Sequence, residues 1–141
     1  MESDCLKQSI GAGTDFTVTN ATAAITLGTT TPSLILTFGT WVVFGRVTLR
    51  TAAATIVGTE TVTVAIKDAS SNVISTLTIL LPAMTTTTKD IGSFTLPIAI
   101  NDNSSASMTP DTLVFHAVLS ASLGAGSLTL TTAEITAIKI F

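Results

Sequence analysis

The residue types that most often carry catalysis or hold metal ions are scarce in this 141-residue chain. It contains one histidine, His116, and one cysteine, Cys5. A zinc site needs several histidine or cysteine ligands, and the sequence lacks the nucleophile-elbow motif of one class of serine hydrolases. The sequence therefore predicts no catalytic residue and no metal site, and it favours a protein that is not an enzyme.

Two further patterns match ligand-binding motifs only in part. Asn101–Asn103, with Asp111 nearby, offers oxygen ligands but lacks the spacing and the terminal glutamate of a calcium loop. An Asx-rich turn explains these residues better. Gly11–Gly13 and Gly124–Gly126 lack the following helix that a phosphate-binding loop requires. We therefore expect no cofactor.

The surface chemistry of the chain is unusual for a globular domain. Charged residues make up 11 % of the sequence, against about 25 % in an ordinary soluble domain. The six Lys and Arg residues are scattered and the net charge is −3, which argues against nucleic acid as a ligand. Threonine hydroxyls can wet a surface, but they give little repulsion between molecules. We therefore expect other chains to cover much of the outer surface; the alternative is a monomer with a threonine-rich surface.

The mean hydropathy of +0.64 raises the question of a membrane location. No segment approaches the ~20 uninterrupted apolar residues that a membrane-spanning helix needs. Met1–Ile10 also lacks the cationic start and the apolar core of a signal peptide. The sequence therefore predicts no membrane partner.

From Asp15 onward, apolar and polar residues alternate with a period of two, which is typical of β-strands. Gly39–Arg50 is the central stretch, and no helical period of useful length appears. Turn signals recur at intervals of about ten residues. The pattern predicts an all-β fold, an antiparallel β-sandwich of jelly-roll type with about eight to ten short strands. The core-facing residues of the central strand are Trp41, Val43, Val47 and Leu49.

Other segments carry signals of different strength. Glu60–Asp68 and Val73–Leu81 flank a turn cluster and predict a hairpin. Thr51–Thr59 is compatible with either a loop or an irregular sheet edge. Thr85–Asp90 predicts an exposed loop, and Leu123–Ser127 predicts a turn.

One predicted strand contains a proline. Phe94, Leu96, Ile98 and Ile100 alternate with smaller residues, so the pattern predicts that they share one face. Pro97 lacks an N–H, which restricts this strand to a sheet edge or a bulge. The segment that follows, Asn101–Pro110, carries the longest loop signal.

Residues 1–14 differ in composition from the rest and predict an N-terminal extended arm, followed by a domain over 15–141. Gly11–Gly13 would act as the hinge. Two interpretations stay open: a frayed terminus, or an anchor that becomes ordered on a partner. In the second interpretation, the anchoring residues are Cys5, Leu6 and Ile10.

Some strands are apolar on both faces, and this predicts contacts with another chain. Thr112–Ser120 is nearly continuous in apolar residues, so both of its faces require burial, one against the core and one against a partner. His116 lies either at such a contact or half-buried in the sheet; at a contact, its proton uptake near pH 6 would weaken assembly. The predicted oligomer interface comprises Val42, Phe44, Val114, His116, Val118, Ile138 and Ile140.

Two stretches carry a resemblance to a known family. Gly39–Val47 resembles a strand motif of the tumour-necrosis-factor-like and complement-type globular jelly rolls. In that motif a glycine is followed by any residue, then by an aromatic residue, and then by alternating apolar residues. Ala133–Ile140 is similar to the final strand of the bacteriophage members of that group. Those members are typically trimeric fibre heads or capsid decoration (cement) proteins. The resemblance covers about residues 15–141.

The resemblance implies a structural virion protein on the capsid surface. Such a decoration protein would form a homotrimer, contact the major capsid protein and stabilise the phage head by bridging capsomers. The alternative is a receptor- or glycan-binding head domain of a tail or head fibre, with sugars held by Thr85–Asp90 or Asn101–Pro110. Neither loop contains the aromatic residue that such sites usually offer. A hydrolase built on a sandwich is the least favoured hypothesis.

Overall fold

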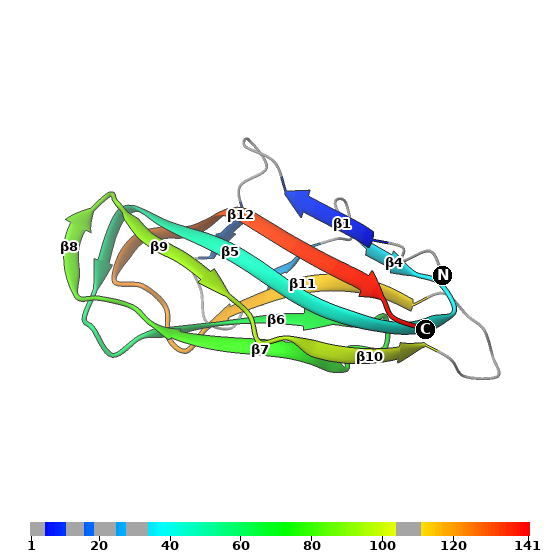
Figure 1. The fold of residues 1–141 in the computed structure, drawn as a ribbon. Coiled ribbons are helices and arrows are strands. Elements are labelled where there is room, and N and C mark those ends of the chain that lie inside the picture. The colour runs from blue at the N-terminus through cyan, green and yellow to red at the C-terminus, as the bar shows by residue number, and fades with distance from the viewer. Residues whose placement is uncertain (1–4, 11–15, 19–24, 28–33, 104–110) are drawn as a thin grey trace.

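The computed structural model describes residues 5–10, 16–18, 25–27, 34–103 and 111–141, and its regular elements are all β-strands (Figure 1). Side chains are described from residue 34 onward within these ranges. The strands are β1 (Cys5–Ile10), β2 (Phe16–Val18), β3 (Ile25–Leu27), β4 (Leu34–Leu36), β5 (Gly39–Ile56), β6 (Thr61–Lys67), β7 (Val73–Leu80), β8 (Met84–Thr87), β9 (Asp90–Thr95), β10 (Ala99–Asn103), β11 (Asp111–Leu119) and β12 (Ala125–Lys139).

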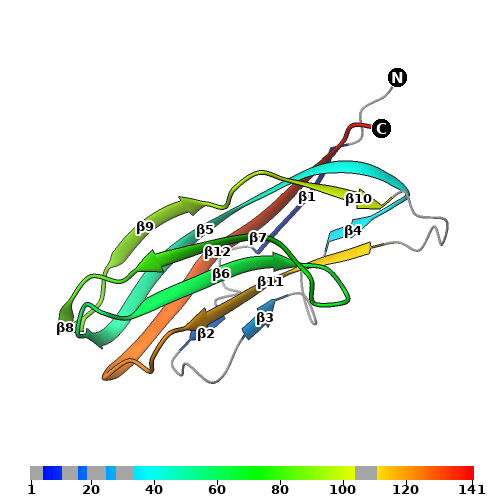
Figure 2. The ribbon, with the colours of Figure 1, turned by 90° about the horizontal axis from the view of Figure 1, so that it is seen from below.

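The strands form two antiparallel sheets that pack face to face (Figures 1 and 2). The seven-stranded sheet has the order β1-β12-β5-β10, with β2 also on β12 and with β8 and β9 also on β5. The five-stranded sheet has the order β3-β11-β6-β7, with β4 also on β11. The chain passes repeatedly from one sheet to the other, and this antiparallel wrapping is that of a jelly roll. The predicted antiparallel β-sandwich of jelly-roll type is confirmed. The prediction of eight to ten short strands is wrong, because the described residues form twelve strands, of which β5 and β12 have 18 and 15 residues.

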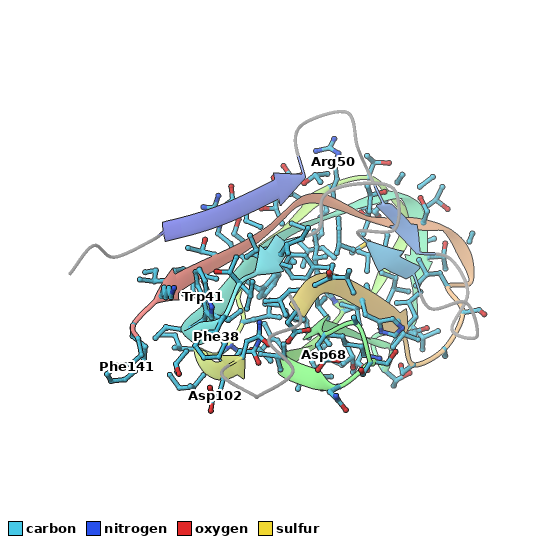
Figure 3. The ribbon with its side chains drawn as sticks, turned by 90° about the vertical axis from the view of Figure 1, so that its right-hand side faces the viewer. Phe38, Trp41, Arg50, Asp68, Asp102 and Phe141 are labelled. Carbon is cyan, nitrogen blue, oxygen red and sulfur yellow. The ribbon has the colours of Figure 1, made fainter. Side chains whose placement is uncertain are left out.

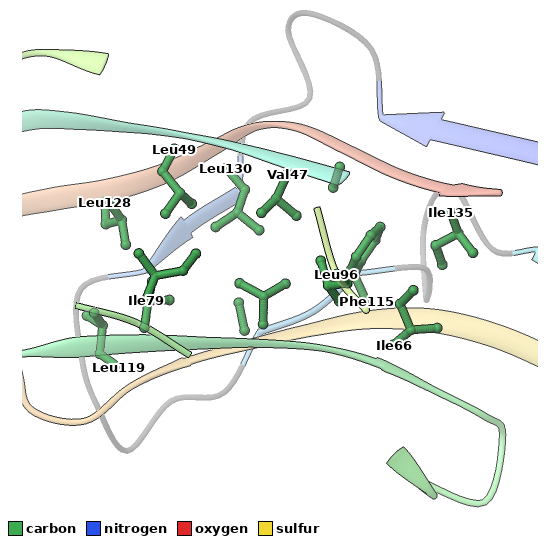
Figure 4. Close-up of a cluster of buried hydrophobic side chains, with 14 of the residues drawn as sticks. Val47, Leu49, Ile66, Ile79, Leu96, Phe115, Leu119, Leu128, Leu130 and Ile135 are labelled. Atoms are coloured by element: carbon green, nitrogen blue, oxygen red, sulfur yellow. The ribbon is translucent and has the colours of Figure 1, made fainter. Parts of the chain in front are cut away.

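The hydrophobic core lies between the two sheets (Figure 4). Buried and less buried residues alternate along β5, β11 and β12, as expected for strands with one face on a core. The predicted inward face of the central strand is confirmed, because all four residues assigned to it are at most 1 % exposed: Trp41, Val43, Val47 and Leu49. Large buried residues of this core include Trp41, Leu49, Ile66, Leu119, Leu128 and Leu130.

Gly45 allows the two sheets to approach each other closely. A Cβ atom at this position would lie 2.9 Å from Cδ1 of Ile66 and 3.1 Å from Cζ of Phe115. Both of these side chains come from the five-stranded sheet. The glycine in the middle of the central strand therefore makes room for core side chains of the opposite sheet.

Two segments that the sequence left open or assigned to a loop are strands. Residues 51–56 continue β5, and the strand is irregular there because Ala53 has a φ of 46°. Of the two alternatives for Thr51–Thr59, the irregular sheet edge therefore describes residues 51–56. The prediction of a loop over Thr85–Asp90 is wrong for residues 85–87, which belong to β8 and pair with the end of β5, and for Asp90, which begins β9; residues 88 and 89 connect the two strands. The buried Thr51 hydroxyl donates to the Thr87 carbonyl over 3.0 Å, and this bond helps to hold the threonine tract in the sheet.

The single strand predicted around Pro97 is divided into β9 and β10. Both pair with β5 at the sheet edge, so the prediction of an edge position is confirmed. Between the Arg46–Thr95 and Val43–Ala99 pairs, residues 96–98 stand opposite only residues 44–45. This extra residue turns the following side chains to the other face of the sheet.

The prediction that Ile98 and Ile100 share one face with Leu96 is therefore wrong. Leu96 is 1 % exposed, whereas Ile98 and Ile100 are 71 % and 60 % exposed. The loop predicted over Asn101–Pro110 is also wrong at its start, because residues 101–103 belong to β10. The remainder of that loop, residues 104–110, lies outside the described residues.

The described part of the predicted arm is an edge strand of the seven-stranded sheet. β1 runs antiparallel to β12, from the pair Cys5–Ile138 to the pair Ile10–Ala133, and Leu6 is paired with Ala137. β2 pairs further along the same strand. Cys5–Ile10 is thus joined to the sandwich through its backbone, while the boundary between arm and domain stays a prediction.

Candidate functional site

The predicted interface residues fall on two opposite faces of the sandwich. Val42 and Phe44 of β5 lie on the outer face of the seven-stranded sheet, between buried neighbours in the sequence. Ile138 of β12 is paired with Val42. Ile140 follows β12, and its backbone N–H donates to the Thr40 carbonyl over 2.8 Å. The structure therefore brings these four predicted residues together.

The other three predicted residues lie on the outer face of the five-stranded sheet. Val114, His116 and Val118 alternate along β11 with buried residues that face the core. His116 is paired with Ala65, and Lys67 with Val114. The core separates this group from the group on β5 and β12, so one two-fold contact does not include both groups. A ring of subunits can use both, because each of its contacts joins two different surfaces.

Three exposed apolar residues that the sequence did not indicate extend the first group. Ile100 is paired with Val42 across β5 and β10, and Ile98 immediately precedes β10. The Phe141 carbonyl accepts the Thr40 N–H over 3.3 Å, and its side chain is 79 % exposed. Figure 3 shows Phe141 at the same end of the molecule as Phe38 and Trp41. We call this surface the apolar end patch: Val42, Ile98, Ile100, Ile138, Ile140 and Phe141.

A hollow of about 410 Å³ adjoins the apolar end patch on the outer face of the seven-stranded sheet. Three neighbouring strands supply its lining, because register places Thr136 of β12 opposite Phe44 of β5, and Thr95 of β9 opposite Arg46 of β5. The predicted interface residue Phe44 therefore lines a concave site. Among the described side chains, the lining is Phe44, Arg46, Thr95, Glu134 and Thr136.

An ion pair forms one part of the hollow. Nη2 of Arg46 lies 3.4 Å from Oε2 of Glu134, and the two side chains are 54 % and 19 % exposed. An exposed pair of this kind stabilises a fold by only about 0–1 kcal/mol. It does, however, place hydrogen-bond donors and acceptors beside the Phe44 ring.

His116 has a pKa below its ordinary value of 6.5, first because burial disfavours the charged imidazolium and second because the Lys67 charge repels it. The side chain is therefore neutral at pH 7, and it takes up a proton only in more acidic solution than a free histidine. In this structure it is half-buried on the sheet surface, which is one of the two positions that the sequence left open.

The oxygen-rich residues of β10 are used in the fold. Nδ2 of Asn101 donates to Oδ2 of Asp111 over 3.1 Å, and Nδ2 of Asn103 donates to the Leu36 carbonyl over 3.0 Å. Among the described residues, no group of three or more His, Cys, Asp or Glu side chains could hold a metal ion. The same ranges contain no helix of the length and apolarity that crossing a membrane requires.

Glu60 organises the turn between β5 and β6. Its carboxylate accepts backbone N–H bonds from Val57 (3.2 Å), Gly58 (3.0 Å) and Thr59 (3.2 Å). The bond from its own backbone N–H is the largest cause that lowers the pKa of Glu60; burial opposes the shift, and the other three N–H groups add to it. The residue is 6 % exposed, so this carboxylate has a structural role.

We expect Glu60→Gln to lower the midpoint of thermal unfolding at pH 7, because an amide accepts these N–H bonds less strongly than a carboxylate. The folded-state pKa of Glu60 is lower than 4.5, so its stabilisation is present above the unfolded-state pKa and is lost as the pH falls through the folded-state pKa. Thermal unfolding followed by circular dichroism at pH 7 and at about pH 3 checks this. The difference in unfolding midpoint between Glu60→Gln and the wild type should be smaller at the acidic pH than at pH 7.

The exposed carboxylate of Asp102, which accepts a bond from Oγ1 of Thr40 over 3.3 Å, provides the control. Asp102→Asn should change the midpoint less than Glu60→Gln at pH 7. An equal difference between Glu60→Gln and wild type at both pH values would show that the Glu60 charge does not stabilise the turn.

Comparisons with known proteins agree with the fold and go no further. No protein-family model matches the sequence, and no curated protein matches it. Dimeric latent PorU from Porphyromonas gingivalis matches with a TM-score of 0.53 at 9 % identity, over 97 % of this chain and 13 % of PorU. At this identity the likeness shows the fold alone. This chain is thus a jelly-roll β-sandwich protein.

Two other solved structures match over their nearly full lengths. FlhE is 11 % identical, with a TM-score of 0.48 over 100 % of both chains. Eiger TNF from S. frugiperda is 11 % identical, with a TM-score of 0.48 over 97 % of this chain and 93 % of that one. Neither score is high enough to support an argument about function.

Proposed function

We propose that this chain is a structural virion protein: a capsid decoration protein that forms homotrimers on the capsid surface, contacts the major capsid protein and stabilises the phage head by bridging capsomers. The observation that carries the proposal is the apolar end patch, on a chain with 11 % charged residues. The assignment to a capsid and the trimeric state rest on the family resemblance of Gly39–Val47 and Ala133–Ile140.

The apolar end patch supports self-association on energetic grounds. Ile98, Ile100 and Phe141 are 71 %, 60 % and 79 % exposed, and burial stabilises by about 25 cal/mol per Å² of apolar surface. The two ion pairs of the described residues, Arg46–Glu134 and Arg50–Asp90, lie on the surface, where each contributes about 0–1 kcal/mol. Apolar contacts therefore outweigh ionic ones on this surface.

The placement of the predicted interface residues also favours a ring. One group lies on the outer face of the seven-stranded sheet, and the other lies on β11 in the opposite sheet. In a cyclic trimer each subunit presents two different surfaces to its two neighbours. Both groups could then be buried in the same assembly.

We expect Ile100→Asp to weaken self-association by about 100-fold or more, because a carboxylate at the centre of an apolar contact loses its hydration without gaining a partner. Sedimentation velocity over a concentration series measures the effect. Thr85→Asp is the matched control, since Thr85 is an exposed residue of β8 and lies outside both groups. The proposed surface is wrong if Ile100→Asp keeps the self-association of the wild type.

A further inference from the structure

The hollow beside the apolar end patch arises from the break in the edge strand. Residues 96–98 stand opposite only residues 44–45, so no regular ladder pair of the edge strand flanks Phe44. Phe44 and Arg46 of β5 line the hollow together with their partners on β12, Thr136 and Glu134. The volume of about 410 Å³ falls within the range of roughly 300–1,000 Å³ that is typical of small-molecule sites.

We propose that this hollow binds a neutral saccharide unit. Its lining discriminates between classes of ligand. The formal charges of Arg46 and Glu134 cancel, so the pair gives an anion or a cation little net attraction, whereas a purely apolar group would remove water from both charges without replacing it. A neutral polyhydroxylated ring suits such a pair, because its hydroxyls can donate to the carboxylate and accept from the guanidinium.

The remaining residues suit the same ligand. The Phe44 ring offers an apolar face against which the C–H face of a sugar can pack. The hydroxyls of Thr95 and Thr136, which also line the hollow, can each donate and accept a hydrogen bond. The sheet surface therefore supplies the aromatic residue that Thr85–Asp90 and Asn101–Pro110 lack.

Binding of methyl glycosides tests the proposal directly. The probes are the methyl glycosides of glucose, galactose, mannose and N-acetylglucosamine, each titrated into the full chain and followed by amide chemical shifts in NMR spectra. We expect saturable binding of at least one glycoside with a millimolar dissociation constant, as for a small ligand in an open site. The shifts should centre on Thr95 and Thr136, which line the hollow.

Two variants and one control assign the binding to the hollow. Phe44→Leu keeps an apolar side chain but removes the ring, and Glu134→Gln removes the carboxylate acceptor; each should weaken binding about tenfold or more. Val57→Ala, at an exposed position outside both interface groups, should change it less than about twofold. If Phe44→Leu does not fold, Glu134→Gln provides the test, because it is nearly isosteric. The proposal is overturned if none of the glycosides binds, or if the folded variants bind as the wild type does.

Saccharide binding and trimer formation are separate proposals that share Phe44, because a subunit contact over the first interface group would also cover the hollow. The same samples distinguish the two proposals. Sedimentation velocity on each titrated sample reports self-association. A monomer that binds a glycoside through Phe44 and Glu134 supports the saccharide site and contradicts the decoration trimer. A trimer that binds no glycoside contradicts the saccharide site alone.

Discussion

Trp41→Ala is expected to lower the free energy of unfolding by about 3–5 kcal/mol. Trp41 is 1 % exposed, and its Nε1–H donates to the Thr37 carbonyl over 3.1 Å. The substitution leaves a large cavity between the sheets and removes one of the two donors to that carbonyl, which keeps the bond from Nδ2 of Asn103 over 3.1 Å. Since small domains are stable by about 5–15 kcal/mol, this single change removes a large part of the total stability.

Urea denaturation followed by far-ultraviolet circular dichroism measures the effect of Trp41→Ala without depending on tryptophan fluorescence. Phe141→Ala is the control, because it also truncates an aromatic residue but at a position that is 79 % exposed. Its effect on the stability of the monomer should stay within about 0.5 kcal/mol. A loss below about 1 kcal/mol for Trp41→Ala would contradict the assignment of Trp41 to the core.

Gly126→Ala is expected to lower the free energy of unfolding by about 3 kcal/mol or more, since it combines two penalties. Gly126 has a φ of +69°, a conformation that costs a residue with a side chain about 1–2 kcal/mol. In addition, a Cβ atom would overlap the carbonyl oxygens of Ala53 and Ala52. These are backbone atoms of β5, so the irregular pairing of β12 with β5 must shift to accept the methyl group.

Gly124→Ala is the matched control for Gly126→Ala. At this position a Cβ atom would lie 3.3 Å from Cγ2 of Thr55 and 3.4 Å from its carbonyl oxygen. The first contact is slightly tighter than an ordinary van der Waals contact, but it is with a side-chain methyl group that needs to move by only a few tenths of an ångström. A loss below about 1 kcal/mol is therefore expected. Chemical denaturation of the two variants side by side checks the difference. Equal losses would show that the tight contact between β12 and β5 is absent.

Features set by neighbouring residues could be predicted from the sequence. The hairpin of β6 and β7 is confirmed, because period-two alternation flanks a turn that stabilises itself. Oδ1 of Asp68 accepts the backbone N–H groups of Ser70 and Asn72, each over 2.9 Å. The inward face of β5 is confirmed for the same reason, since alternation alone decides which side chains lie together.

Features that depend on pairing between distant strands could not be predicted in this way. The extra residue that turns Ile100 outward becomes visible only when β9 and β10 are aligned on β5. Alternation likewise indicated that Val42 and Val114 point away from the core, but it could not assign them to opposite sheets. The hollow joins Phe44, Thr95 and Glu134 from three separate strands, and no spacing in the sequence links these residues.

The molar mass of the wild-type chain in solution tests the central proposal most directly. Light scattering coupled to size-exclusion chromatography at micromolar concentration should give three times the chain mass of 14.4 kDa. This mass should be unchanged in high salt, because apolar contacts are not screened. A mass of one chain at every concentration would contradict the account, since the apolar end patch would then be open to solvent.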